Sequence, residues 1–158
     1  MLRAVYQVGS SVILSKHRDI DYLYIYDTIE EKREAFRKGK HEKGIDNHYV
    51  ALEKVPFIYI GCWGYRYAKL ISGEEIDAIK NFNLFEHKDR LKEMCLKYFG
   101  VLRDTDKHWY HILILCYMFE KKKMTLTKAQ IKVVQQVHDN GITKELKEYC
   151  VNIISNLE

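Results

Sequence analysis

The residues best suited to chemistry in this chain are a Gly-Ser pair and two aspartates that follow it. Gly9-Ser10 ends a short apolar run, and Asp19 and Asp21 stand at the start of the next one. Backbone N–H groups of such a turn can hold a phosphate. Side chains two residues apart on a strand point the same way, so the two carboxylates can hold a hard cation such as Mg²⁺. A turn that can bind a phosphate, followed by two carboxylates that can bind a metal ion, suggests phosphate-transfer chemistry.

Two strands must position these residues. Residues 3–8 are β-branched and aromatic and end at a glycine, and residues 19–26 alternate with a period of two. On the second run the two aspartates share a face with Leu23 and Ile25. A polar rim above an apolar core has this pattern.

The remainder of the chain predicts an α+β fold. Thr28 and Glu31 fit a capping box for a helix at 28–38, a polar loop follows, and a third strand is expected at 49–55. Residues 57–60 look like a further strand, and the aromatic stretch from Trp63 to Leu70 could be helical. Helical patterns follow at residues 74–80, 87–98, 105–121, 127–138 and 143–156, with Asp104 or Thr105, and Thr127, as caps and Gly141 between the last two.

This order of elements predicts two regions. Strands come first and helices afterwards, which favours a small mixed-sheet head over residues 1–73 and a helical C-terminal region over residues 74–158 packed on it.

The composition is that of a folded protein. Of 158 residues, 47% are apolar and 13% aromatic, which predicts a core and excludes a disordered chain. A net charge of +4 permits nucleotide or nucleic-acid partners without requiring them. No membrane-spanning run or leader is visible, so we expect a cytoplasmic protein with no membrane partner. The four scattered cysteines form no C-x-x-C pair and should be buried thiols.

Two stretches of the chain resemble a known family. Gly9-Ser10 followed by Asp19-Ile20-Asp21-Tyr22-Leu23 resembles the signature of the nucleotidyltransferase superfamily, which has a polymerase-β-like fold. The downstream segments Asn83-Leu84-Phe85, Trp109-Tyr110-His111 and Gly141-Ile142-Thr143 look like the C-terminal half of the small predicted nucleotidyltransferases of bacteria and phages.

The resemblance implies a metal-dependent transfer of a nucleoside monophosphate from a nucleoside triphosphate to an acceptor (protein, RNA or small molecule), with release of pyrophosphate. Gly9 and Ser10 would hold the β- and γ-phosphates, and Asp19 and Asp21 would bind Mg²⁺ or Mn²⁺. The superfamily typically adds a third carboxylate from a following strand. Asp46 and Glu53 are the candidates here, and Asp46 is slightly favoured. Lys16 and Arg18 could offset the triphosphate charge.

Two other functions compete with this one. A catalytically weak or inactive protein of the same fold, acting as a binding or phage host-interaction factor, is favoured by Val12-Ile13-Leu14, where the family commonly has a second glycine. A helical ribonuclease-type module has only the short pattern Arg103-x4-His108 behind it and ranks last.

Three further features have structural explanations that we favour over functional ones. His108 and His111 lie one helical turn apart, but His111 is expected to be a core histidine rather than a metal ligand. The lysine run 121–123 suits a helix C-terminus. The tyrosines at 22, 24 and 26 are expected to lie mainly in the core, although one ring could stack on a base.

Overall fold

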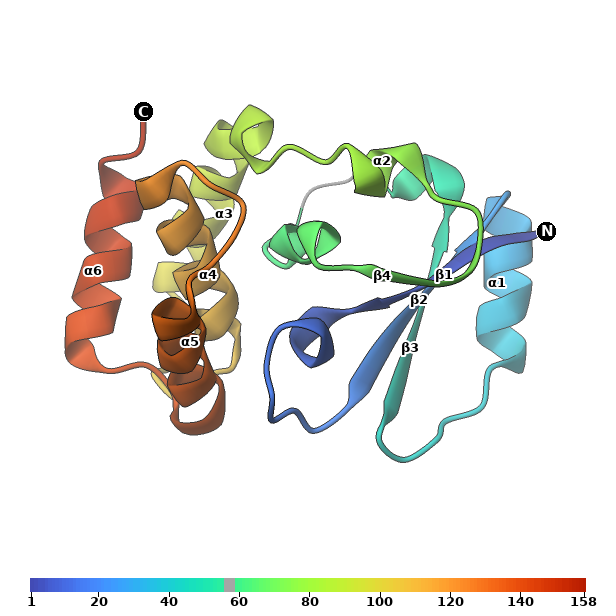
Figure 1. Cartoon of the computed structure of the whole chain (residues 1–158), viewed down its shortest axis with the longest axis horizontal. Coiled ribbons are helices and arrows are strands. Elements are labelled where there is room, and N and C mark those ends of the chain that lie inside the picture. Colours follow the sequence, from blue (N-terminus) through green and yellow to red (C-terminus); the bar gives the residue numbers. More distant parts are fainter. Residues whose placement is uncertain (56–58) are drawn as a thin grey trace. The chain divides into compact units, whose positions relative to one another are not determined.

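The computed structural model describes residues 1–55 and 59–158 and has an α+β fold, with a four-stranded mixed sheet followed by C-terminal helices (Figure 1). The chain divides into two compact units. The sheet unit holds residues 1–55 and Gly64–Phe82, and the helical unit holds residues 59–63 and Asn83–Glu158. Strand β4 ends at Gly73, and the sheet unit continues beyond it through the short helix α2.

The sheet has the strand order β3-β2-β1-β4. Strand β1 pairs antiparallel with β2 and with β4, whereas β2 and β3 run parallel. The end of β1 and the starts of β2 and β3 therefore lie together, and we call this the carboxylate end of the sheet. The strands are β1 Leu2–Val8, β2 Ile20–Tyr26, β3 Ile45–Ala51 and β4 Lys69–Gly73.

The two faces of the sheet differ in their covering. Ile25 on β2 is 0% exposed, and Ala4 and Tyr6 on β1 share its face and are also buried. The Tyr6 hydroxyl on that face accepts a hydrogen bond from the Ile76 N–H. On the opposite face, Tyr49 of β3 meets the edge of Phe36 from helix α1 (Ile29–Lys38). Within β2 only Ile25 is buried. The tyrosines expected mainly in the core were placed wrongly, because Tyr22, Tyr24 and Tyr26 are half-buried on the opposite face.

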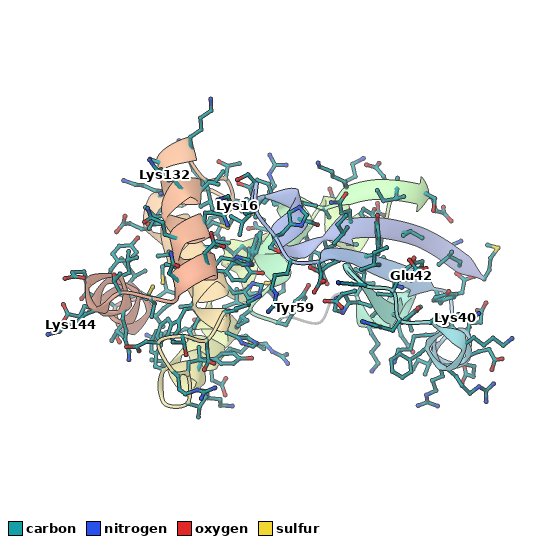
Figure 2. All side chains as sticks on the ribbon, turned by 90° about the horizontal axis from the view of Figure 1, so that it is seen from below. Lys16, Lys40, Glu42, Tyr59, Lys132 and Lys144 are labelled. Carbon is teal, nitrogen blue, oxygen red and sulfur yellow. The ribbon has the colours of Figure 1, made fainter. Side chains whose placement is uncertain are left out.

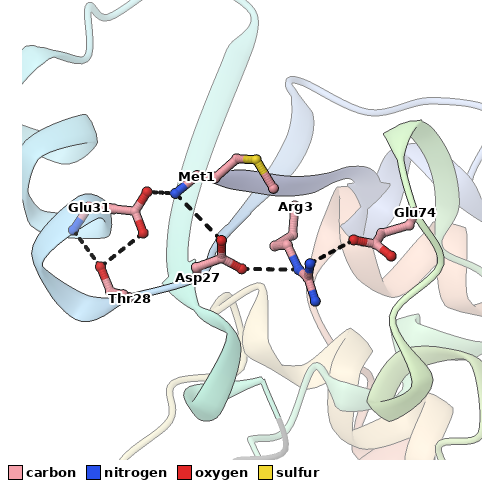
Figure 3. Close-up of polar contacts among 6 residues, drawn as sticks. All are labelled: Met1, Arg3, Asp27, Thr28, Glu31 and Glu74. Atoms are coloured by element: carbon pink, nitrogen blue, oxygen red, sulfur yellow. Dashed lines mark hydrogen bonds and ion pairs between the residues drawn. The ribbon is translucent and has the colours of Figure 1, made fainter.

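Helix α1 starts within a polar network that also holds β1 (Figure 3). The Thr28 side chain accepts a hydrogen bond from the Glu31 N–H, as the expected N-cap requires. The Glu31 carboxylate accepts a hydrogen bond from the Thr28 hydroxyl and pairs with the amino group of Met1. Asp27 pairs with Arg3, which also contacts Glu74 beyond β4. The ion pairs of Arg3 thus join the start of β1 to the chain just after β2 and just after β4.

The helical unit is built around α4 (His108–Lys121), whose side chains from Ile112 to Cys116 are all 0% exposed. Helices α5 and α6 contact α4, and α3 contacts α6. Such a helix, apolar nearly all round, needs neighbours on several sides. The other helices are α2 Asp77–Lys80, α3 Lys88–Phe99, α5 Lys128–Asn140 and α6 Lys144–Ser155, with 3₁₀ turns at Gly9–Val12, Leu52–Lys54, Cys62–Arg66 and Leu84–His87.

Several sequence-based boundaries were wrong. The third strand spans Ile45–Ala51 rather than 49–55. Its polar first half is a strand because it pairs with β2, and the strand ends at Ala51 because Leu52–Lys54 forms a 3₁₀ helix. The expected strand at 57–60 lies partly outside the described residues, and Tyr59 and Ile60 are not in a strand. The expected helix from Trp63 to Leu70 is a 3₁₀ turn only as far as Arg66, and β4 already begins at Lys69.

The cysteines are free and buried, as expected. Burial raises the pKa of the Cys62 and Cys95 thiols to about 12, which keeps them protonated and unreactive at neutral pH. None of the helices in the described part of the chain has the length and apolar character needed to cross a bilayer.

A matched pair of threonines tests the cap of α5. Thr127 and Gln130 form a complete capping box, whereas Thr125 lies two residues before the N-cap and is exposed. We expect Thr127→Ala to lower the free energy of unfolding by about 1 kcal/mol, because the first turn loses a hydrogen-bond acceptor. Thr125→Ala should change it by less than about 0.5 kcal/mol. Urea denaturation of both variants measures the difference, and equal losses would contradict the capping role.

Candidate functional site

The sequence-predicted turn and carboxylates meet at the carboxylate end of the sheet. Val8, the last residue of β1, is the register partner of Asp21 on β2, and Asp21 is the register partner of Asp46 on β3. Neighbouring strands lie about 4.8 Å apart, so these residues form one row across three strands. The Gly9-Ser10 turn follows directly after Val8.

Gly9 lies so close to Asp21 that a side chain at position 9 would displace the Asp21 carboxylate. Gly9 has a φ of +73°, and a Cβ built there would lie 2.5 Å from Asp21 Oδ2. Such a distance is a collision, so the missing side chain is what lets the carboxylate lie against the main chain of the turn. The main chain of the Gly9 turn and the Asp21 carboxylate therefore lie in direct contact.

The two serines that follow Gly9 both make hydrogen bonds within the turn. Ser10, predicted to hold a phosphate, is 7% exposed, and its carbonyl accepts hydrogen bonds from the Ile13 and Leu14 N–H groups. Ser11 was not singled out, yet its hydroxyl donates to the Val8 carbonyl and accepts from the Gln7 amide. Ser10 is thus part of the internal frame of the turn, and Ser11 fixes the turn to the end of β1.

The structure separates the two candidates for the third carboxylate. Asp46 lies beside Asp21 in the parallel register, whereas Glu53 follows the opposite end of β3. Asp19 lies one residue before β2 and is half-buried. Two carboxylates, Asp21 and Asp46, are therefore adjacent by strand register, and Asp19 lies two residues before Asp21 in the chain.

His48 is the site residue that sequence reasoning missed. Its Nε2 lies 3.1 Å from Asp21 Oδ1, and the side chain is 56% exposed. The hydrogen bond with Asp21 is the largest cause of a raised His48 pKa, which burial opposes and the charges of Asp21 and Asp46 reinforce. The available signal was its spacing of two from Asp46, which places both on one face once the strand is known.

The donor set suits one mode of metal binding. Among residues 1–55 and 59–158, no group of three or more His, Cys, Asp or Glu side chains is arranged to hold a metal ion. Mg²⁺ is often bound by one or two carboxylates, with phosphates and waters completing the octahedron. Asp21 and Asp46 fit this mode because they are adjacent oxygen donors whose like charges repel, and a cation would relieve that repulsion.

The two predicted phosphate cations, Lys16 and Arg18, lie in the loop before β2 and are exposed. That loop is at the carboxylate end, since the Ile20 N–H that follows it donates to the Gly44 carbonyl before β3.

The two histidines of the helical unit contact aromatic side chains of the same unit, and His111 is half-buried rather than a fully buried core residue. His111 Nδ1 accepts a hydrogen bond from Trp63 Nε1–H at 2.9 Å, and His108 stacks on Tyr98. Burial, together with the charges of His108 and His138, lowers the pKa of His111 to about 3. A neutral imidazole is required as the acceptor, which explains why this histidine stays unprotonated.

Comparison with protein-family models, curated proteins and solved structures finds no match for this chain. The resemblance to nucleotidyltransferases therefore stays a prediction from the sequence.

A pair of glycines tests the Gly9–Asp21 contact. Gly9 and Gly44 both have positive φ, but a Cβ at Gly44 would meet nothing within 4 Å. We expect Gly44→Ala to cost about 1 kcal/mol of unfolding free energy from backbone strain alone. Gly9→Ala should cost about 2–3 kcal/mol, because the methyl group also collides with a carboxylate.

The collision can be isolated with a double mutant. In an Asp21→Ala background, Gly9→Ala should cost no more than Gly44→Ala, since the colliding oxygen is gone. Chemical denaturation of the four variants measures these costs. An undiminished cost in that background would show that the contact does not exist.

The lowered pKa of the half-buried His111 ring predicts a stability that is sensitive to acid. Its folded pKa of about 3 lies below the ordinary 6.5, so only the unfolded chain takes up a proton between these values. The free energy of unfolding should be unaffected above pH 6.5 and should fall as the pH is lowered below it, by about 1–2 kcal/mol at pH 5 for this partly buried ring.

His111→Asn keeps an acceptor near the position of Nδ1 but cannot titrate. We expect urea denaturation at pH 7 and pH 5 to show a smaller loss of stability for this variant than for the unaltered protein. Equal losses in both proteins would assign the acid sensitivity to other groups.

Proposed function

We propose that this protein is a metal-dependent nucleotidyltransferase, which moves a nucleoside monophosphate from a nucleoside triphosphate to an acceptor hydroxyl. The observation that carries the proposal is the meeting of three groups at the carboxylate end. These are the Gly9 turn, the Asp21 carboxylate packed against it, and Asp46 in register beside Asp21. An anion cradle next to paired carboxylates is the arrangement that this chemistry requires.

The reaction balances without a further co-reactant. The oxygen of the acceptor hydroxyl forms a bond to the α-phosphorus, and the bond from that phosphorus to the bridging oxygen of the β-phosphate breaks. Pyrophosphate leaves with the electron pair, and the hydroxyl proton passes to solvent. Because the attacking and leaving oxygens must be in line, the enzyme's main task is to position them and to stabilise charge.

The chain's own residues would divide this task. The backbone of the turn that begins at Gly9 would hold phosphate oxygens, while the space beside Gly9 itself accommodates the Asp21 carboxylate. Asp21 and Asp46, with Asp19 adjoining, would hold Mg²⁺ or Mn²⁺. The bound metal would neutralise phosphate charge and lower the pKa of the attacking hydroxyl. Lys16 and Arg18 would add positive charge from the loop before β2.

A second candidate is a protein of this architecture that binds a nucleotide or a partner without turnover. Two observations favour it. His48 already occupies one oxygen of Asp21, and Ser10 is buried within the turn. Each removes a group that a transferase would use directly.

Transfer is tested with nucleoside triphosphates labelled at the α-phosphate, Mg²⁺ or Mn²⁺, and a bacterial lysate as the source of acceptors. We expect labelled product with the unaltered protein and a loss of about 100-fold or more with Asp21→Asn or Asp46→Asn, because a metal ligand is lost without a change of shape. Asp89→Asn, an exposed residue of α3, is the matched control and should retain full transfer.

Binding separates the two candidates. Manganese-dependent binding of a non-hydrolysable triphosphate, measured by calorimetry, should be lost with Asp21→Asn if the site is as proposed. Binding without labelled product from any lysate would favour the non-catalytic protein. If the unaltered protein neither binds nor transfers nucleotide, the proposed function is wrong.

A further inference from the structure

Both carboxylate oxygens of Asp21 are in contact with other groups of the sheet unit. Oδ2 faces the turn, since it would lie 2.5 Å from a Cβ built at Gly9. Oδ1, the oxygen farther from the turn, lies 3.1 Å from His48 Nε2. An ionised carboxylate can only accept, so the His48 N–H is the donor. The Asp21 side chain is 22% exposed, which leaves the carboxylate little open surface.

The two contacts of Asp21 differ in how easily they can open. Val8, which precedes Gly9, is the register partner of Asp21, so the pairing of β1 with β2 holds the turn against the carboxylate. His48, by contrast, is 56% exposed and lies on an edge strand. Within residues 1–55 and 59–158, the bond to Asp21 is the only hydrogen bond of its side chain. Exposed side chains change rotamer within nanoseconds, so the His48 contact is the one that can open.

His48 and a metal ion would compete for the same carboxylate. Asp21 and Asp46 are register partners, and His48 shares a face of β3 with Asp46 because the two are separated by one residue. Carboxylates in adjacent positions repel each other, and a hydrogen-bond donor beside them relieves part of that repulsion. A divalent cation would relieve it too and would need Asp21 Oδ1, the oxygen that His48 holds.

We propose that His48 is a latch on the candidate metal site, which holds Asp21 Oδ1 when closed and must leave it before a divalent cation binds there. This inference rests on the proposed function and names how that same site is regulated. A binding site that is only partly open has a reduced apparent affinity. A latch closed for about nine-tenths of the time would raise the apparent dissociation constant about 10-fold.

The opposite role for His48 would be to support the carboxylate. Outer partners that hydrogen-bond a metal-binding carboxylate often orient it, and their loss weakens metal binding by about 10–100-fold. Such support requires the other oxygen to be free for the metal. Asp21 Oδ2 is instead the oxygen packed against Gly9, so the geometry favours the latch. The two roles predict changes of opposite sign when His48 is removed.

The latch is tested by the binding of Mn²⁺ alone, measured from the electron paramagnetic resonance signal of the free ion, without nucleotide or acceptor. We expect His48→Ala to bind Mn²⁺ about 3- to 10-fold more tightly than the unaltered protein, which is the range that one such hydrogen bond supplies. His48→Gln keeps an N–H donor near the position of Nε2 and should bind Mn²⁺ as the unaltered protein does.

His41→Ala is the matched control. His41 is an exposed histidine between Lys40 and Glu42, in the loop before β3 (Figure 2). Its removal should change the affinity for Mn²⁺ by less than about 2-fold. In an Asp21→Asn background, which removes the ionised partner of the latch, His48→Ala should have no effect on the binding that remains. Thermal unfolding of all variants checks that they are folded.

The outcomes distinguish the latch from the proposed function. If transfer occurs, His48→Ala should lower the Mn²⁺ concentration that gives half the maximal rate. The inference is wrong if His48→Ala weakens Mn²⁺ binding or leaves it unchanged, or if neither protein binds Mn²⁺. Transfer that requires Asp21, together with equal Mn²⁺ affinity of the two proteins, would retain the proposed function and remove the latch. Tighter Mn²⁺ binding by His48→Ala without any transfer would do the reverse.

Discussion

The parallel register between β2 and β3 is the constraint on which the rest of the site depends. It places Asp21 beside Asp46 and brings the loops before both strands to one end of the sheet. The antiparallel pairing of β1 adds the Gly9 turn at that same end. A shift of one residue in β3 would turn Asp46 to the opposite face and disperse the row. Site and fold are thus specified by the same pairing.

Apolar and aromatic packing holds this register against the repulsion of its charges. Tyr24 and Tyr49 are register partners and stack with centroids 5.3 Å apart, and Ile25 is completely buried on the other face. Two carboxylates in adjacent positions oppose the pairing. The His48 contact with Asp21 offsets part of this repulsion, and a bound cation would offset more. An arrangement that costs stability at the rim of a well-packed sheet is characteristic of a functional site.

The sequence predicted the elements that carry strong local patterns. The strand at 20–26 and the four long C-terminal helices were found because their hydrophobic periodicity lies in neighbouring residues, and Thr127 was found as the cap of α5. The expected cap of α4 at Asp104 or Thr105 was wrong, because Lys107 is its N-cap and no side chain caps it. Strand β4 was missed because all five of its residues are exposed and show no alternation, so only pairing with β1 makes it a strand. The start of β3 was missed for a similar reason, since its polar residues gain their structure from β2.

The sequence by itself determined the α+β class, the Gly9 turn and the candidate aspartates, because these follow from local residue types and spacing. Tertiary structure decided which carboxylates are neighbours. It places Asp46, and not Glu53, beside Asp21. It also brings His48 into contact with Asp21 and buries Ser10 in the turn. The Ile20–Gly44 hydrogen bond joins the loops before β2 and β3. These relations join residues far apart in the chain, and strand register, which local patterns do not encode, is what sets them.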